Sequence, residues 1–216
     1  MKLRPVRAAR GMVGAGNPLA AAEGLAVLRA GGNAVDAAIA AAAVLAVVSP
    51  HECGLGGDML GLVYDAASGQ VHALNASGRS PAAATLEQYR DGMPMTGARS
   101  ISVPGMVGGW AAAVQRFGSR PLDTLLAGAI RYAEEGFLAY TDLIGNTAER
   151  SASILADPHC QALFLPEGQP LREGALLRQP AAAATLRAIA AGGAAGFFLG
   201  PVGGCVGAAA DGRGAP

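Results

Sequence analysis

Apolar residues recur at helical spacing over most of the chain, which predicts a protein built largely of amphipathic helices. The first helix is expected to begin at Pro18, a residue that the first helical turn tolerates, and to end before Gly31. Further helices are expected over 34–47, 106–117, 121–135, 141–156 and 180–191, with a shorter helical piece over 86–90.

The helix over 34–47 is apolar on nearly every side, so it is expected to be central and buried. Asn33 lies at the N-cap position of this helix. Asp36 lies three residues later, where its carboxylate can reach back to the free amide groups of the first turn. Ser49 and Pro50 end the helix. The pattern therefore predicts one anchored core helix early in the chain.

Two strand-like runs, 59–64 and 70–74, flank a turn sequence and predict a β-hairpin. A further short strand is expected at 11–15. Together with the helices that dominate the second half of the chain, these strands indicate the α/β (α+β) fold class. The last residues, 200–216, follow neither a helical nor an alternating period and are expected to form a disordered tail.

Composition and charge exclude several classes of partner. The chain is 51% hydrophobic and 15% charged, and its 16 basic residues balance 16 acidic ones. Nucleic-acid binders normally carry a basic excess, so no nucleic-acid partner is expected. The longest apolar run, 37–48, is shorter than the roughly 20 residues that span a bilayer, and no signal peptide is evident. We therefore expect a cytoplasmic protein without a membrane partner.

No metal or cofactor site is evident in the sequence. The cysteines, Cys53, Cys160 and Cys205, are odd in number and have no metal-like spacing, and the histidines form no ligand cluster. Cys53 follows His51 by two residues, but neighbours in sequence do not normally face each other, so a packed thiol is favoured over a nucleophile. We expect free thiols, and neither a metal nor a cofactor.

Two segments are candidates for ligand binding. Arg79 follows the predicted hairpin and lies between Gly78 and the Ser80-Pro81 pair, on a stiff stretch of chain. An arginine held in this way can donate two parallel hydrogen bonds to a carboxylate, although an ordinary surface arginine is the alternative. The glycine-rich turn 54–58 either brings backbone amides to a ligand or is structural, and it lacks the Gly-Lys-Ser/Thr sequence of a phosphate loop. These residues alone name no reaction.

Several short motifs in a fixed order resemble one known family. They are Gly31-Gly32-Asn33-Ala34-Val35-Asp36, Pro50-His51, Gly54-Leu55-Gly56-Gly57-Asp58, Gly78-Arg79-Ser80-Pro81, Val103-Pro104-Gly105 and Glu135-Gly136-Phe137. In order and spacing, residues 11–199 resemble the N-terminal part of the large subunit of the γ-glutamyltransferases, also called γ-glutamyl transpeptidases or glutathione hydrolases. We therefore assign residues 1–199 to this region.

The resemblance implies part of an N-terminal-nucleophile hydrolase fold, a four-layer αββα sandwich. Precursors of this family cut themselves into a large and a small subunit. The threonine exposed by the cut attacks the γ-glutamyl amide with its own amino group as base, and the acyl-enzyme passes to water or to an amine acceptor. By this resemblance, Arg79 matches the arginine that grips the α-carboxylate of the substrate, and the glycine turn supports the sheet near the site.

The sequence departs from the family pattern in two ways. None of its threonines is followed by the Thr-Thr/Ser-His pattern of the family nucleophile, and beyond residue 199 it becomes rich in glycine and alanine. We therefore expect the front part of a large subunit, without catalytic residues and inactive alone, that needs the missing small-subunit segment. Half of a sandwich would expose sheet edges and an apolar face, which predicts association or aggregation.

Two alternatives to a γ-glutamyl enzyme remain open. The Gly57-Asp58 ending of the glycine turn and the absence of a signal peptide favour a branch of acylases and amidohydrolases that act on other acyl substrates. A non-catalytic, partner-dependent subunit that docks a separately encoded small subunit is the second alternative.

Overall fold

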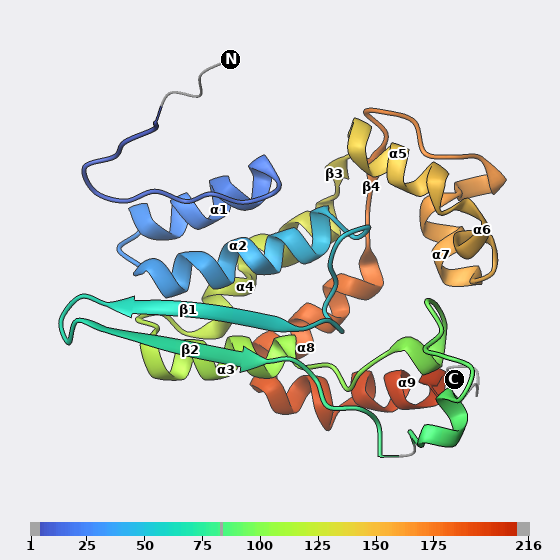
Figure 1. The fold of residues 1–216 in the computed structure, drawn as a ribbon. Helices are drawn as coiled ribbons and strands as arrows, with labels where there is room; N and C mark the ends of the chain where they lie inside the picture. The colour runs from blue at the N-terminus through green and yellow to red at the C-terminus, as the bar shows by residue number, and fades with distance from the viewer. Residues whose placement is uncertain (1–4, 83, 211–216) are drawn as a thin grey trace.

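The computed structural model describes residues 5–82 and 84–210 and places them in a helical body with one long hairpin (Figure 1). In chain order the elements are α1 (Pro18–Arg29), α2 (Ala34–Val48), β1 (Met59–Asp65), β2 (Gln70–Ala76), η1 (Leu86–Tyr89), η2 (Ala98–Ser100), α3 (Met106–Phe117), α4 (Leu122–Glu135), β3 (Phe137–Leu138), α5 (Thr141–Glu149), α6 (Ser151–Leu155), α7 (Pro158–Phe164), η3 (Pro166–Gly168), β4 (Leu176–Leu177), α8 (Pro180–Phe198) and α9 (Pro201–Ala210). The mixture confirms the expected α/β class.

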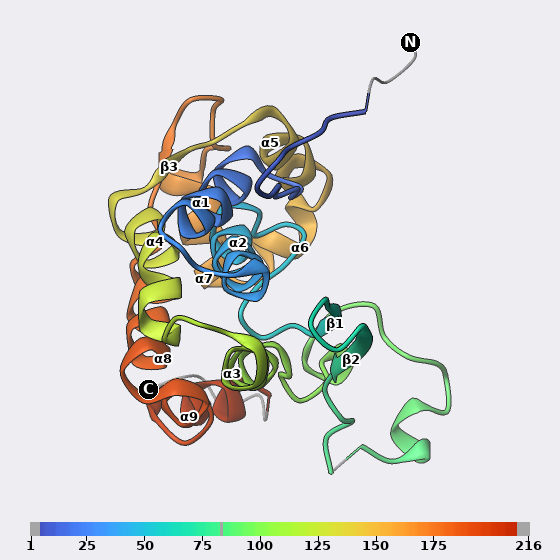
Figure 2. The same cartoon turned by 90° about the vertical axis from the view of Figure 1, so that its left-hand side faces the viewer.

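Helix α2 lies at the centre of the body, with α1, α3 and α4 packed around it (Figures 1 and 2). Its residues from Ile39 to Val48 are almost all buried, as the apolar pattern predicted. The core continues through Trp110 of α3, Leu126 of α4 and Leu186 of α8, all of which are fully buried. One helix therefore organises the helical layer.

The N-terminus of α2 is held by the carboxylate of Asp36, which is fully buried. The predicted capping box is present: Asn33 N–H donates to Asp36 Oδ2 over 2.8 Å, and Asp36 N–H donates to Asn33 Oδ1 over 3.0 Å. The same carboxylate accepts hydrogen bonds from the backbone and hydroxyl of Ser119 and from the backbone of Arg120. Burial raises the pKa of Asp36, but these hydrogen bonds outweigh it and hold that pKa below its ordinary value.

The C-terminus of α2 is also capped by side chains from distant segments. The Tyr140 hydroxyl donates to the Val48 carbonyl over 3.1 Å and contacts the Ser49 hydroxyl over 3.0 Å. Gln179 Nε2 donates to the Val47 carbonyl over 2.6 Å. Because carbonyls in the last turn of a helix have no partner within it, these contacts satisfy groups that would otherwise be buried and unpaired.

The β1–β2 hairpin is antiparallel, with Met59 opposite Ala76 and Asp65 opposite Gln70. Its inner face contributes Met59 and Leu74 to the core, next to α3. Its outer face is apolar yet uncovered within the part of the chain that the structure describes. The exposed side chains are Leu60, Leu62, Tyr64 and Val71, with exposed fractions of 73%, 77%, 66% and 63%.

Three of the strands and helices predicted from the sequence differ from those in the structure. Residues 11–15 are extended but form no strand, because no described strand lies beside them to complete a ladder. The helix expected over 141–156 is interrupted at Arg150 and forms α5 and α6. Helix α8 continues to Phe198, past the expected end at 191, through an irregular residue at Gly193 (φ 58°, ψ −145°).

The segment expected to be a disordered tail is helical from Pro201 to Ala210. Pro201 occupies the first turn of α9, where a missing N–H costs nothing, and α9 packs against α8. Tertiary packing therefore overrides the weak local signal of the glycines. Residues 211–216 of the expected tail lie outside the described residues.

One described helix, α8, is long and apolar enough to cross a bilayer by length and composition. Its side chains Leu186 and Ile189 are fully buried in the core, where α8 packs against α4. Arg187 forms a two-pronged ion pair with Glu134 of α4, with N–O distances of 2.6 Å. One face of α8 therefore packs into the core against α4.

We predict that Asp36→Ala lowers the free energy of unfolding by about 3 kcal/mol, measured by urea denaturation at pH 7. The substitution leaves the amide groups of Asn33, Ser119 and Arg120 without their acceptor. Asp123→Ala is the matched control, because Asp123 is exposed and, within the described residues, its carboxylate accepts hydrogen bonds from its neighbour Thr124 alone. An equal loss in both variants would contradict the anchoring role of Asp36.

A linked prediction concerns acid stability. Because the pKa of Asp36 is lower in the folded protein than its ordinary value of 3.8, ionised Asp36 stabilises the fold above that value. The stabilisation is lost as the pH falls through the lowered folded-state pKa. Asp36→Asn should therefore flatten the acid limb of the unfolding free energy between about pH 5 and pH 2, whereas Asp123→Asn should not. An unchanged acid limb in Asp36→Asn would contradict this prediction.

Candidate functional site

Three glycine-containing segments meet at the open end of the hairpin, where β1 begins and β2 ends (Figure 1). They are the turn 54–58, the residues 76–79 that follow β2, and the residues 103–105 that precede α3. The register places Met59 opposite Ala76, so the residues just beyond each strand end are neighbours in space. Motifs that are far apart in the sequence are thereby brought into one cluster.

Hydrogen bonds that involve backbone groups join the three segments. Asp58 Oδ1 accepts from the Gly78 amide over 2.9 Å, and the Arg79 carbonyl accepts from the Val103 amide over 2.9 Å. The Gly57 carbonyl accepts from the amides of Gly105 and Met106 over 3.1 and 2.9 Å. The glycine turn therefore holds both the start of α3 and the backbone just before Arg79.

Two glycines are required by the close approach of these backbones. A Cβ atom at position 78 would lie 1.6 Å from the Val103 carbonyl oxygen, and one at position 105 would lie 2.0 Å from the Ala76 carbonyl oxygen. No side chain fits at such distances. The Gly-Arg and Pro-Gly motifs of the sequence thus have a packing reason: they let two chain segments touch at the base of the projecting connection between β2 and α3 (Figure 2).

Arg79 is exposed at this cluster. Among the residues that the structure describes, no hydrogen bond or ion pair involves its guanidinium group, while its backbone carbonyl is bound to Val103. A guanidinium with a held backbone and free donors can take a carboxylate in a two-pronged hydrogen bond. The geometry is therefore compatible with the carboxylate-binding role expected for Arg79, which remains a prediction.

Cys53 is a packed thiol, in agreement with the sequence analysis. Its Sγ donates to the Ser49 carbonyl over 3.7 Å, and it is half-buried at the end of α2. Burial, helped by the negative charge of Glu52, raises the pKa of Cys53 to about 11. At neutral pH the group is a neutral thiol rather than the thiolate that nucleophilic catalysis needs.

The described residues contain no group of three or more His, Cys, Asp or Glu side chains that could hold a metal ion. Asp157 and Cys160, which are close in sequence, are explained by helix capping, since Asp157 Oδ1 accepts from the Cys160 amide over 2.8 Å. This pair has a structural role at the start of α7.

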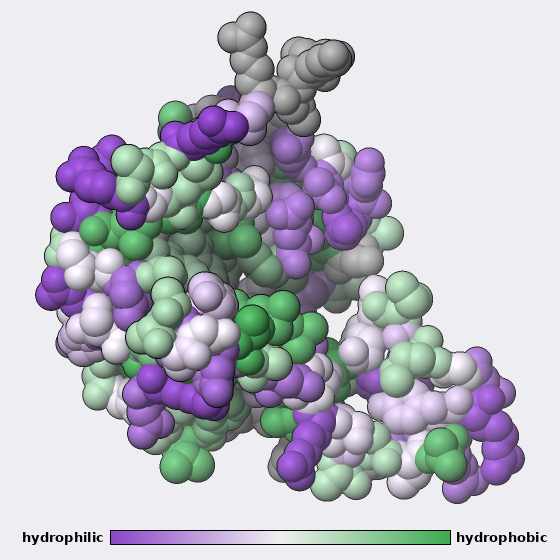
Figure 3. All heavy atoms as spheres, turned by 60° about the vertical axis from the view of Figure 1, so that its left-hand side comes forward, coloured by the Kyte–Doolittle hydropathy of each residue, from purple (hydrophilic) through white to green (hydrophobic). Residues whose placement is uncertain are grey.

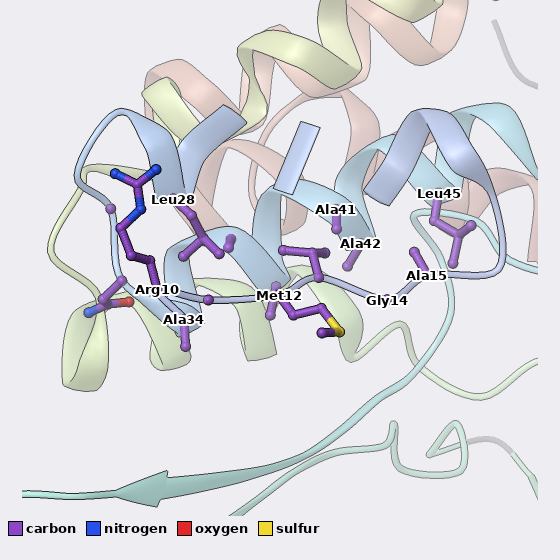
Figure 4. A pocket seen from close by; sticks show the side chains of 15 residues that line it. Arg10, Met12, Gly14, Ala15, Leu28, Ala34, Ala41, Ala42 and Leu45 are labelled. Atoms are coloured by element: carbon purple, nitrogen blue, oxygen red, sulfur yellow. The ribbon is translucent and has the colours of Figure 1, made fainter. Parts of the chain in front are cut away.

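Two apolar grooves lie along the same side of α2. The first, of about 610 Å³, separates α2 from the extended segment 10–15 and is lined by Met12, Leu28, Ala41 and Leu45, with Arg10 at one end (Figure 4). The second, of about 350 Å³, separates α2 from β1 and is lined by residues that include Ala38, Ala42, Leu62 and Trp110. Among the described residues that line them, neither groove pairs an acidic side chain with a basic one.

Sequence reasoning missed Asp58 as a partner of the Gly78 amide. The available signal was its position: Asp58 directly precedes one strand of the hairpin, and Gly78 lies two residues after the end of the other. Only an accurate hairpin register, which the sequence did not supply, would have placed the two side by side.

Known proteins of one family are similar to this chain in sequence. The family model described as Gamma-glutamyltranspeptidase matches residues 20–215, so the match also includes α9. The chain is 36% identical over 213 residues to the Acylase ACY 1 proenzyme of Pseudomonas sp. (strain V22), covering 93% of this chain and 38% of that protein. It is 38% identical over 200 residues to the Oxamate amidohydrolase proenzyme of Klebsiella pneumoniae, covering 89% of this chain and 38% of that protein.

Among solved structures, the gamma-glutamyltranspeptidase of Helicobacter pylori superimposes with a TM-score of 0.89 at 30% identity, covering 94% of this chain and 60% of that chain. The chain thus spans well under half the length of the two curated relatives and about three fifths of the solved chain. The match over 20–215, with the same fold at 30% identity, shows that this chain belongs to the gamma-glutamyltranspeptidase family.

Proposed function

We propose that this chain is the front part of the large subunit of an amide hydrolase or acyltransferase, and that Arg79 binds a carboxylate of the acyl donor. The observation that carries the proposal is the arrangement of Arg79: an exposed guanidinium beside backbone that is held by Asp58 and Val103. A γ-glutamyl compound is the donor expected from the family, because its α-carboxylate suits a two-pronged arginine contact.

The reaction we propose proceeds through an acyl-enzyme. The hydroxyl of an N-terminal threonine adds to the amide carbonyl, its amino group takes the hydroxyl proton, and that proton passes to the leaving amine as the C–N bond breaks. Water or an amine acceptor then attacks the ester and releases the acyl group and the threonine. Arg79 would contribute by holding the donor in one orientation during both steps.

The nucleophile is proposed to come from a segment outside this chain. None of the threonines in the sequence is followed by the family's nucleophile pattern, and Cys53 is a protonated, packed thiol. Relatives described as proenzymes extend well beyond the length matched here. We therefore propose that the chain alone does not hydrolyse amides.

A second candidate is an acylase or amidohydrolase with a different acyl donor. It is favoured by the identity to relatives that are named an acylase and an oxamate amidohydrolase. Oxamate carries a carboxylate beside its amide carbon, so the same Arg79 contact would serve that donor. The choice between donors then depends on the distance from the bound carboxylate to the scissile amide.

The remainder of the proenzyme is proposed to cover the outer face of the hairpin and the two grooves on α2. The outer face presents Leu60, Leu62 and Tyr64 to solvent at exposed fractions of 66% or more. Figure 3 shows hydrophobic side chains gathered in the middle of this side of the molecule. Strands have unpaired backbone groups along the hairpin edges, and the extended residues 11–15 lack a strand partner in the described part. Strands from the remainder of the proenzyme would pair with the hairpin edges and with residues 11–15, and the layer they form would cover the apolar outer face.

We predict that the purified chain shows no γ-glutamyl-p-nitroanilide hydrolysis, and that adding the remainder of the proenzyme as a second polypeptide restores it. In the restored enzyme, Arg79→Ala should lower kcat/KM at least about 100-fold, because the donor loses its charged, two-pronged contact. Arg90→Ala is the matched control, since Arg90 is an exposed arginine of the same connection whose ion pair with Glu87 is at the surface.

Two results would contradict the proposal in different ways. Hydrolysis by the chain alone would show that the nucleophile is not missing. Equal kcat/KM for Arg79→Ala and Arg90→Ala in the restored enzyme would remove the substrate role of Arg79. Repeating the assay with oxamate, and following ammonia release, separates the two candidate donors.

We also predict that Leu62→Lys abolishes association with the remainder of the proenzyme, measured by size-exclusion chromatography with light scattering. A lysine on the outer face would place a charge where a covering layer excludes water. Leu86→Lys is the matched control, because Leu86 is 93% exposed but lies outside the hairpin. Both variants should keep the wild-type circular dichroism. Unchanged association of Leu62→Lys would argue against the hairpin face as the contact.

A further inference from the structure

We infer that Asp58 is a positioning residue whose carboxylate fixes the backbone from which Arg79 projects. The inference deepens the proposed function, since it rests on Arg79 as the group that binds the donor carboxylate. It assigns a task to the acidic residue that ends the glycine turn, a residue that takes no part in the bond-breaking steps described above.

The need for a positioning residue arises from Gly78. The approach of the Val103 carbonyl leaves no room for a side chain at position 78, so this residue must be glycine. Glycine is also the residue with the widest backbone freedom, and here it directly precedes Arg79. Without a restraint, rotation about the Gly78 backbone would swing the guanidinium away from any fixed substrate position.

Hydrogen bonds at Gly78 and at Arg79 supply the restraint on the backbone between them. The Gly78 amide donates to Asp58 Oδ1 over 2.9 Å, and the Arg79 carbonyl accepts from the Val103 amide over 2.9 Å. Asp58 itself is held because it follows Gly57, whose carbonyl is bound to the first amides of α3, and precedes β1. A carboxylate acceptor makes the Gly78 contact stronger than a neutral acceptor would.

The hydrogen bond of Asp58 differs from those of Asp65, the aspartate at the turn that joins β1 to β2. Asp65, at the far end, accepts from Ala67 and Ser68, which are its own neighbours in sequence. The Asp58 contact instead joins residues that are 20 positions apart. Loss of the Asp65 contact would loosen a local turn, whereas loss of the Asp58 contact frees the residue that carries Arg79.

The test compares Asp58→Ala, Asp58→Asn, Asp65→Ala and Arg79→Ala in the full chain. Glutathione binding is measured by following the Arg79 Nε–Hε signal in ¹H–¹⁵N spectra, and by calorimetry for Arg79→Ala. We expect Asp58→Ala to weaken binding about tenfold. Asp58→Asn, which keeps an acceptor oxygen, should stay within about twofold of wild type, and Asp65→Ala should not differ from it. Arg79→Ala should lose binding.

Two further readouts apply whether or not glutathione binds. The Gly78 amide proton should move upfield in Asp58→Ala, as a proton that loses its acceptor does, and stay near its wild-type position in Asp58→Asn. Trypsin should cut the Arg79–Ser80 bond at least fivefold faster in Asp58→Ala than in Asp65→Ala. Rescue by asparagine is a result that general destabilisation would not produce.

The outcomes separate the inference from the proposed function. If Arg79→Ala binds glutathione as wild type does, or if wild type does not bind it, the proposed donor contact of Arg79 fails. The amide signal and the trypsin rate then decide whether Asp58 holds this backbone. If Asp58→Ala leaves the Gly78 amide and the cleavage rate unchanged, or binds glutathione as tightly as wild type, the positioning role of Asp58 is overturned.

Discussion

The buried carboxylate of Asp36 is the contact on which the rest of the described structure depends. It closes the capping box of α2 with Asn33 and at the same time accepts hydrogen bonds from Ser119 and Arg120, in the connection between α3 and α4. A buried charge is tolerated only when several donors surround it, and here these donors come from two distant parts of the chain. One side chain therefore fixes both the start of the core helix and the path of the helices that pack on it.

The position of the candidate site follows from this anchored helix. Trp110 of α3 is buried against α2, and the amide at the start of α3 is bound to the Gly57 carbonyl. The glycine turn, the hairpin ends and α3 are thus linked through hydrogen bonds and core contacts. Arg79 follows the last of these linked segments and is exposed to solvent. This arrangement suits the proposed contact of Arg79 with a carboxylate, because a held backbone limits where the guanidinium can lie.

The apolar outer face of the hairpin is a second constraint on how the chain acts. Large exposed patches of this kind are rare in proteins that work alone and are common at interfaces. The chain belongs to the gamma-glutamyltranspeptidase family and spans less than half the length of the curated relatives it matches. The hairpin is covered on one side and leaves the apolar area of its other side in water. Burying this area would favour the proposed association with a separate segment.

Local signals in the sequence determined the helices α1 to α4, the hairpin and the capping box at Asp36, because caps, turns and periodicity act over a few residues. Motif order alone suggested the family and Arg79. The sequence did not predict that residues 11–15 would lack a strand partner in the described part of the chain, that Pro201–Ala210 would pack as a helix, or that Asp58 would bind the Gly78 amide. Only the tertiary structure decided these features, because each depends on which segments pack side by side: α9 against α8, Asp58 beside Gly78, and no described strand beside residues 11–15.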